Sequence, residues 1–297
     1  MEIRNLVAFL QVASTKNFTQ SAQILGYSQS NISMQIQSLE NELGVSLFDR
    51  VGHNISLTQY GEELIPYAQQ VVSLVMQIQD FQRSDKEMGG TLKIGIVESL
   101  FEAIFEETIR RYHARFPKVK IELTVDGTSE LQDALKNGKI DIAYLIDDAL
   151  NKSYWNCLYS HSVEIAIVAN SNNSITKKNQ LSIKDISNQE FILVEESAPY
   201  NSSFQHCAAL NNIEIDLFLQ LQSTKMARKL VSTGSYISVL PIYTVKKSIE
   251  DGDIKILNIP EFSLKQQVQI VVYKNKILTP QMNGFIEESK YILDSIL

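Results

Sequence analysis

The stretch from residue 18 to residue 43 constrains this chain most strongly, because it holds two helical patterns separated by one glycine. Thr19, with Asn17 just upstream, offers an N-cap oxygen to the first pattern, in which apolar residues recur three and four positions apart. Gly26 interrupts this pattern, and glycine tolerates the tight turn that two packed helices need. Ser28 then caps a second helix, whose apolar positions are Ile32, Ile36, Leu39 and Leu43.

The outward face of the second helix is polar and nearly uncharged. Its side chains are amides, hydroxyls and a thioether, from Gln29, Ser30, Ser33, Met34 and Gln37. Amides can pair bidentately with adenine, and hydroxyls donate to or accept from several base edges. The stretch is therefore typical of a helix-turn-helix that enters the major groove of DNA, with Thr19 of the first helix as a further candidate contact. An ordinary helical hairpin has the same spacing and is the alternative.

Segments on both sides of this pair complete a winged helix. Residues 6–13 show helical amphipathic spacing and predict a third helix for the pair to pack against. After residue 44, turn residues within an alternating pattern predict a short hairpin, the wing. Arg50 and His53 lie near its tip and are candidate contacts to the DNA backbone. The alternative for Arg50 is an ion pair with Asp49 or Glu42.

The charge of this region is unusual for a DNA-binding module. Residues 1–88 carry five Lys and Arg against nine Asp and Glu, which accounts for −4 of the formal net charge of −7. Neutralising phosphates supplies most of the non-specific affinity of DNA-binding proteins. DNA affinity must then come from few cationic contacts, helix N-termini, neutral donors and multivalency. The competing hypothesis is a ligand-binding module that has lost useful DNA affinity and acts through protein partners.

Residues 58–84 predict one long helix. Apolar residues recur there at spacings of three and four, which is a heptad seam, and Pro66 lies early enough to kink the helix without ending it. A helix of roughly 39 Å seldom packs only within its own small domain. We therefore expect a dimerisation helix that places two DNA-binding modules on successive half-sites. Packing on the C-terminal domain of the same chain is the alternative.

Beyond Gly89 and Gly90 the pattern changes to alternating strands and helices. Strands at 92–97, 119–125 and 140–146 with helices at 100–116 and 131–137 predict a parallel βαβαβ unit. A second series has strands at 163–169, 191–194, 217–222 and 236–240, with helices at 202–210 and 225–232. A last strand at 267–272 and a helix at 280–297 suggest a return to the first unit. We therefore expect two α/β lobes with a cleft between them.

Other features exclude several classes of protein. The two cysteines are too few for a disulfide framework, and we expect two buried thiols in a reducing compartment. No secretory signal or membrane-length apolar run is present, so we expect a cytoplasmic protein. The four histidines and two cysteines show no metal-ligand or nucleophile–base spacing. The sequence therefore predicts neither an enzyme nor a metal site. The alternative of a bilobal solute-binding protein or enzyme is disfavoured, because it would leave residues 1–88 unexplained.

Over essentially its whole length the chain resembles the LysR-type transcriptional regulators. The resemblance is carried by LVAFLQVASTKNFTQSAQILGYSQSNISMQIQSLENELGVSLFDR, SLTQYGEEL, FPKVKIELTVDGTSELQDALKNGKIDIAYL and STGSYISVLP. It implies a winged helix-turn-helix DNA-binding domain at 1–58 and a linker and dimerisation helix at 59–88. It also implies an effector domain at 89–297, similar to periplasmic binding proteins, with lobe I at about 89–161 and 268–297 and lobe II at about 162–267.

The same resemblance implies partners. They are promoter DNA, a second copy of the chain in a homodimer or homotetramer, and a small-molecule inducer whose identity is unknown, with no other cofactor and no membrane. The sequence departs from the family pattern at four positions. The family usually has basic residues at or near the positions of Met34, Gln37 and His53, and Tyr60 replaces a common alanine.

Ligands of open α/β sheets bind beyond the carboxyl ends of strands, where helix N-termini present free N–H groups. This rule selects as candidate effector contacts Ser99, Leu100, Thr128, Ser129, Tyr200, Asn201 and Thr224. Their hydroxyls and the helix-end amides suit a carboxylate or phosphate-like group, but no arginine lies at these strand ends. Amino acids, small aromatic acids and neutral metabolites therefore stay open. Ser99, Ser129 and Thr224 are equally well explained as simple N-caps.

Overall fold

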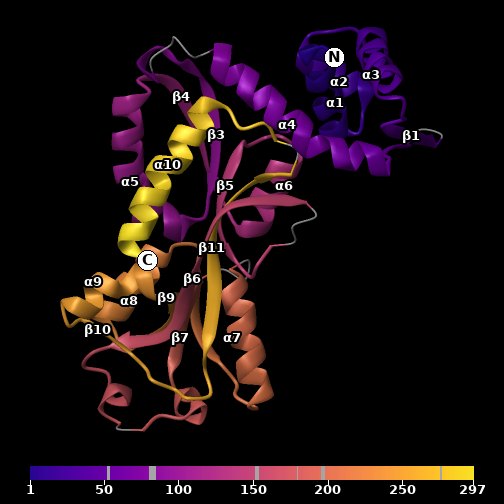
Figure 1. Ribbon diagram of the computed structural model, residues 1–297. Helices are drawn as coiled ribbons and strands as arrows, with labels where there is room; N and C mark the ends of the chain where they lie inside the picture. The colour runs from indigo at the N-terminus through magenta and orange to yellow at the C-terminus, as the bar shows by residue number, and fades with distance from the viewer. Residues whose placement is uncertain (52–53, 80–84, 151–153, 179, 195–197, 275) are drawn as a thin grey trace. The chain divides into compact units, whose positions relative to one another are not determined.

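The computed structural model describes residues 1–51, 54–79, 85–150, 154–178, 180–194, 198–274 and 276–297 (Figure 1). The chain divides into two compact units. Unit 1 consists of Met1–Met88 with Lys274–Asn283, and unit 2 consists of Gly89–Tyr273 with Gly284–Leu297. No helix among the described residues is long and apolar enough to cross a membrane.

Unit 1 contains the predicted helices and hairpin, namely α1 (Ile3–Thr15), α2 (Phe18–Leu25), α3 (Gln29–Leu43), β1 (Phe48–Val51), β2 (Asn54–Leu57), α4 (Gln59–Gln79) and η1 (Asp85–Glu87). The cap of α2 is Asn17, whose side chain accepts the Gln20 N–H at 3.0 Å, whereas Thr19 lies inside the helix. Ser28 caps α3 as predicted, by accepting the Asn31 N–H at 3.2 Å. Gly26 and Gly44 end the two helices with φ of 71° and 72°, in the left-handed region that glycine tolerates.

The core of unit 1 joins the three helices to the hairpin. Phe48 of β1 lies against Phe9 of α1 and Phe18 of α2, with ring centroids 5.6 and 6.0 Å apart. Ile32, Ile36 and Leu39 of α3 are fully buried in the same cluster. Packing of one face of α3 in this way leaves its opposite face free for another molecule.

α4 has two apolar faces. One face packs into the core of unit 1 through Ile65, Ala68 and Val72. The other exposes large apolar side chains at heptad-like spacing, from Tyr60, Tyr67, Leu74 and Ile78. Within the described residues the helix ends at Gln79; residues 80–84 of the predicted helix lie outside them.

The described strands of unit 2 form one nine-stranded sheet in the order β4-β3-β5-β11-β6-β9-β7-β8, with β10 paired to β6. The first series is β3 (Gly89–Ile96), α5 (Glu98–Arg115), β4 (Lys118–Val125), α6 (Thr128–Lys136) and β5 (Ile142–Asp147). β3 runs parallel to both β4 and β5, which confirms the predicted βαβαβ unit. Gly89 and Gly90, beyond which the strands were expected to start, already pair with β4 as the first residues of β3.

The second series differs more from the sequence prediction. It consists of β6 (Trp155–Asn170), η2 (Ser174–Lys177), η3 (Ile183–Ile186), β7 (Glu190–Val194), α7 (Pro199–Leu210), β8 (Asp216–Leu221), α8 (Thr224–Thr233), β9 (Ile237–Pro241), α9 (Ile242–Glu250), β10 (Ile254–Ile256), β11 (Leu264–Tyr273) and α10 (Pro280–Ile296). β7 runs parallel to β8 and β9, as expected. The strand predicted at 163–169 is only half of β6, which runs antiparallel to β9 and β11. Its assignment to a parallel series was wrong, and α9 and β10 were not predicted.

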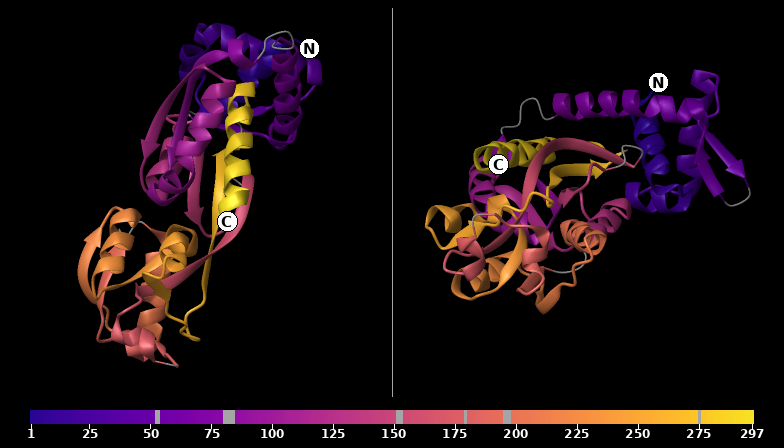
Figure 2. Two further views of the ribbon diagram at one scale, coloured as in Figure 1. Left: turned by 90° about the vertical axis from the view of Figure 1, so that its left-hand side faces the viewer. Right: turned by 90° about the horizontal axis from the view of Figure 1, so that it is seen from below.

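β6 and β11 connect two lobes of unit 2 (Figures 1 and 2). We define lobe I as β3, β4, β5, α5, α6 and the part of α10 in unit 2, and lobe II as β7–β10 and α7–α9. In lobe I, α5 packs against α10, where Phe285 contacts the ring of Tyr112 at 5.0 Å between centroids and Arg111 pairs with Glu288 at 2.7 Å.

The expectation of buried thiols was wrong, because Cys157 is exposed and Cys207 is half-buried.

Candidate functional site

The outward face of α3 carries the predicted base contacts. Gln29, Ser30 and Gln37 are exposed there, Ser33 is half-buried, and Met34 is 62% exposed. The side-chain amide of Gln29 lies 3.4 Å from the hydroxyl of Ser33, one helical turn further on. An amide beside a hydroxyl forms a small surface that both donates and accepts hydrogen bonds. α3 therefore presents the neutral polar groups that a helix needs to read base edges.

The acidic residues of α3 lie outside this face. Oε1 of Glu40 accepts the backbone N–H groups of Leu47 and Phe48 at 2.7 and 3.3 Å. Glu42 pairs with the amino group of Met1 at 2.5 Å. The first two turns of α3, which hold most of the polar face, contain no charged residue. The two acidic residues of α3 therefore lie outside its outward polar face.

The remaining predicted DNA contacts lie on α2 and on the wing. Thr19 is exposed in the first turn of α2. Arg50 pairs through its backbone with Ile55 in the β1–β2 hairpin, but its side chain is outside the described part of the structure. His53 lies outside the described residues. Contacts from the wing to DNA therefore stay predictions.

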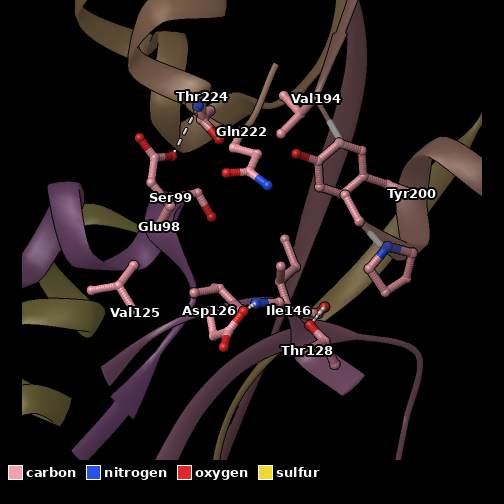
Figure 3. A pocket seen from close by; sticks show the side chains of 14 residues that line it. Glu98, Ser99, Val125, Asp126, Thr128, Ile146, Val194, Tyr200, Gln222 and Thr224 are labelled. Atoms are coloured by element: carbon pink, nitrogen blue, oxygen red, sulfur yellow. Dashed lines mark hydrogen bonds between the residues drawn. The ribbon is translucent and has the colours of Figure 1, made fainter. Parts of the chain in front are cut away.

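A cavity of about 200 Å³ lies between the two lobes of unit 2, at the carboxyl ends of β3, β4, β5, β7 and β8 (Figure 3). The structure brings four predicted effector contacts together there, namely Ser99, Thr128, Tyr200 and Thr224. Each lies in the first turn of a helix that follows a strand, on α5, α6, α7 and α8 respectively. The cavity therefore has the position that the topology of an open α/β sheet favours for a ligand.

Three other candidates do not line the cavity. Leu100 is fully buried, the Ser129 hydroxyl bonds to the Glu130 carboxylate at 2.9 Å, and the Asn201 amide donates to the backbone carbonyl of Val194. The alternative role of Ser99, Ser129 and Thr224 as N-caps is not what the structure shows, since the N-caps are Val97, Gly127 and Ser223.

The polar contacts around the cavity join the two lobes. The Glu98 carboxylate of lobe I accepts the Ser223 hydroxyl and the Thr224 backbone N–H of lobe II, both at 2.9 Å. The Tyr243 hydroxyl lies 2.8 Å from Oγ of Ser99, and burial raises the pKa of Tyr243, so this phenol stays protonated. A ligand in the cavity would therefore lie among side chains that already hold the lobes together.

Sequence reasoning missed several lining residues. It did not single out the strand-end side chains Val125, Asp126, Ile146 and Gln222. They lie at the ends of β4, β5 and β8 or directly after them, upstream of the helix starts that the rule selected or, for Ile146, on a strand that no helix follows. The same rule, extended back to the end of each strand, would have found them. Among the described residues no cluster of three or more His, Cys, Asp or Glu could hold a metal ion.

Comparison with known proteins identifies the family. Residues 85–291 match the model of the LysR substrate binding domain, and residues 3–62 match the bacterial regulatory helix-turn-helix protein, lysR family. A regulator named YwqM from Bacillus subtilis (strain 168), described as an uncharacterized HTH-type transcriptional regulator, is 30% identical over 97% of this chain and 98% of its own length. The chain belongs to the LysR family of transcriptional regulators.

Solved structures agree with the fold of a full-length LysR-type protein. CbnR in complex with its target DNA is similar with a TM-score of 0.52 and 21% identity, over 98% of this chain and all of that one. Full-length BenM is similar with a TM-score of 0.53 and 24% identity, over 99% and 97% of the two chains. The curated relatives are transcriptional regulators rather than enzymes. The chain is thus a LysR-type DNA-binding transcriptional regulator with a helix-turn-helix and an effector-binding domain.

Proposed function

We propose that this LysR-type regulator binds promoter DNA through α3, and that a small metabolite held in the cavity of unit 2 changes this binding. The observation that carries the proposal is the position of the cavity between two lobes that side chains from both sides join. A ligand that contacts both lobes stabilises one arrangement of them over another, and so shifts the equilibrium between arrangements. The expected cytoplasmic location belongs to the same proposal.

The contacts between α5 and α8 join the two lobes in a defined arrangement. Glu102 of α5 pairs with Arg228 of α8 at 2.9 Å and with Lys225 at 3.6 Å. Arg228 also donates to the backbone carbonyl of Thr244 at 2.8 Å, which fixes its guanidinium. Together with the bonds of Glu98 and Ser99, these contacts join lobe I to lobe II beside the cavity. Any ligand that alters the spacing of α5 and α8 must strengthen or weaken these contacts.

The exposed apolar face of α4 supports self-association. Tyr67 is 68% exposed and Ile78 is 71% exposed, although both are large apolar side chains on one helix. A second copy of α4 would cover this face as in a coiled coil. The proposal therefore includes a homodimer, and a homotetramer as a dimer of dimers, with a DNA-binding domain at 1–58, a linker helix at 59–88 and the two-lobed effector domain at 89–297. Two α3 helices would then occupy successive half-sites.

The DNA-binding part is tested by footprinting on the intergenic DNA upstream of the protein's own gene, titrated against salt. Gln29→Ala and Ser33→Ala are expected to lose sequence preference, because each removes a base-edge contact worth about 1–3 kcal/mol of discrimination. Arg50→Ala is expected to weaken all DNA alike and to reduce the salt slope by about one, as loss of a phosphate contact does.

Matched controls separate these effects from general damage. Gln220→Ala and Lys255→Ala alter exposed residues of β8 and β10 in unit 2, and are expected to leave the footprint unchanged. A wild-type footprint in all three unit 1 variants would contradict the assignment of α3 and the wing. No binding at low salt by a folded dimer would instead favour the competing hypothesis, a ligand-binding module without useful DNA affinity.

A further inference from the structure

The cavity between the lobes is negatively charged. Its described lining includes the carboxylates of Glu98 and Asp126 and contains no Lys, Arg or His. Glu98 is half-buried at the start of α5, and Asp126 is exposed at the rim, where one of its oxygens accepts the Gly127 N–H at 2.9 Å. A ligand that entered would displace water from these carboxylates, which is costly unless the ligand compensates their charge.

One of the four helix N-termini at the cavity, that of α8, is already occupied by a carboxylate of the chain. The N-terminus of α8 presents the backbone N–H of Thr224 and the hydroxyl of Ser223, and helix N-termini commonly bind anions in this way. Here both groups donate to the two oxygens of Glu98, as Figure 3 shows for Thr224. The chain thus supplies its own carboxylate at this position. An anionic ligand at the end of α8 would have to displace Glu98 and then lie beside the expelled charge.

The opposite wall offers a less charged surface. Figure 3 shows Tyr200 facing Glu98, Ser99 and Asp126 across the cavity, with its hydroxyl directed toward the side chain of Gln222. Tyr200 and Ile146 are 2% and 3% exposed, so their side chains form a fixed apolar surface of the cavity. An apolar cavity of roughly 150 Å³ holds one benzene molecule, so this cavity suits a ligand of only slightly larger size.

We infer that the cavity takes a small metabolite with a protonated amine, whose ammonium group lies on the side of the cavity that carries Glu98 and Asp126 while its apolar part packs on Tyr200. This inference rests on the proposed function of the same cavity and specifies the chemical class of its ligand. It revises the expectation from the sequence that hydroxyls and helix-end amides suit a carboxylate, because the amide of α8 is taken by Glu98. Each oxygen of Glu98 keeps a further lone pair for an ammonium donor.

The test compares compounds that differ in charge but hardly in size. Two triplets serve as probes: benzylamine, benzyl alcohol and benzoate, and butylamine, butanol and butyrate. Binding to the full-length protein is measured by ligand-observed NMR and by calorimetric titration. In each triplet the amine is expected to bind at least about tenfold more tightly than the alcohol or the carboxylate, because a charge-assisted hydrogen bond distinguishes them.

Variants of Glu98 and Asp126 test whether these two carboxylates cause the preference for amines. Glu98→Gln can keep both contacts of α8, since the amide oxygen accepts the Thr224 N–H and the amide nitrogen donates to Ser223. It is expected to lower the affinity for each amine by about tenfold and to leave the affinity for the alcohols unchanged. Asp126→Asn changes an exposed residue, so it tests the same idea without risk to the fold. The matched control is Asp133→Asn, which removes an exposed carboxylate of α6 outside the cavity lining.

Several results would overturn the inference. They are tighter binding of either carboxylate than of its amine, binding of no amine at all, and equal amine affinity in the wild type and both cavity variants. Footprinting with and without the bound probe separates this inference from the proposed function. Carboxylate binding that alters the footprint refutes the ligand class alone, whereas amine binding that leaves every footprint unchanged refutes the proposed switch and supports the ligand class.

Discussion

Substitution of Gly61 by alanine tests how the winged helix is joined to α4. Gly61 lies in the first turn of α4 and is buried. A Cβ atom at this position would lie 2.3 Å from the carbonyl oxygen of Leu47 and 2.8 Å from Cδ2 of Leu57. The carbonyl cannot retreat cheaply, because it accepts the Thr58 N–H at 3.0 Å and the Leu47 N–H is held by Glu40 at 2.7 Å.

The sign of the expected effect is opposite to that at an ordinary helix position. Replacing glycine by alanine inside an exposed helix stabilises a protein by about 1 kcal/mol. Here overpacking costs about 1–3 kcal/mol, and loss of the bond between Thr58 and Leu47 costs about 1 kcal/mol more. The net expectation is a destabilisation of about 1–3 kcal/mol after the propensity gain is subtracted. For a unit of this size each kcal/mol lowers Tm by about 4–8 °C.

The assay is calorimetric unfolding of the full-length Gly61→Ala protein, in which the transition of unit 1 should move to lower temperature. Gly89→Ala is the matched control, because a Cβ there would lie 3.6 Å from the nearest atom, which is ordinary contact. Its effect is expected to be neutral or stabilising by up to about 1 kcal/mol. A Gly61→Ala protein that unfolds at or above the wild-type temperature would refute the argument that α4 is pressed against the backbone of Leu47.

Two further predictions concern local contacts. Ser28→Ala removes the cap of α3 and is expected to destabilise unit 1 by about 1 kcal/mol in denaturant titration, whereas Ser30→Ala should change stability by less than about 0.5 kcal/mol. In η3, the bond from Lys178 and the donors of Ser182 lower the pKa of Asp185 from 3.8 to about 2. Its contribution to stability is therefore present above pH of about 4 and lost toward pH 2, so the Tm difference between wild type and Asp185→Asn should shrink over that range.

The winged helix could be predicted from the sequence because its signals are local. The cap of α3 at Ser28 and the glycines that end α2 and α3 act within a few residues, and the structure confirms them. The long strand β6 shows where such reasoning fails. Only its second half, near Ile165 and Ile167, is fully buried and therefore apolar, while its first half is largely exposed. Its antiparallel pairing with β9 and β11 depends on residues about 70 to 120 positions away, and no local pattern encodes that.

The location of the cavity could be predicted from the sequence, but its contacts could not. The rule that ligands lie at the carboxyl ends of strands locates the first turns of the helices that follow, and thereby Ser99, Thr128, Tyr200 and Thr224. It says nothing of what those turns contact. The partner of the α8 N-terminus is Glu98, 126 residues away in sequence from Thr224, so only the folded chain shows that this helix end is occupied. The chemistry of the cavity therefore follows from tertiary contacts, while its location follows from the order of strands and helices.

The low positive charge of the DNA-binding surface has a consequence for regulation. A protein that contacts few phosphates binds each half-site weakly, since counterion release provides much of the affinity for DNA. In the proposed dimer, occupancy would then depend on both copies engaging at once, which raises affinity by about 10²–10⁴ and is lost when geometry forbids it. A ligand that changed the spacing of the two copies would remove this whole gain rather than a fraction of it. Under the proposed function, weak individual contacts on α3 would thus make the regulator more responsive to its cavity than a strongly basic surface would.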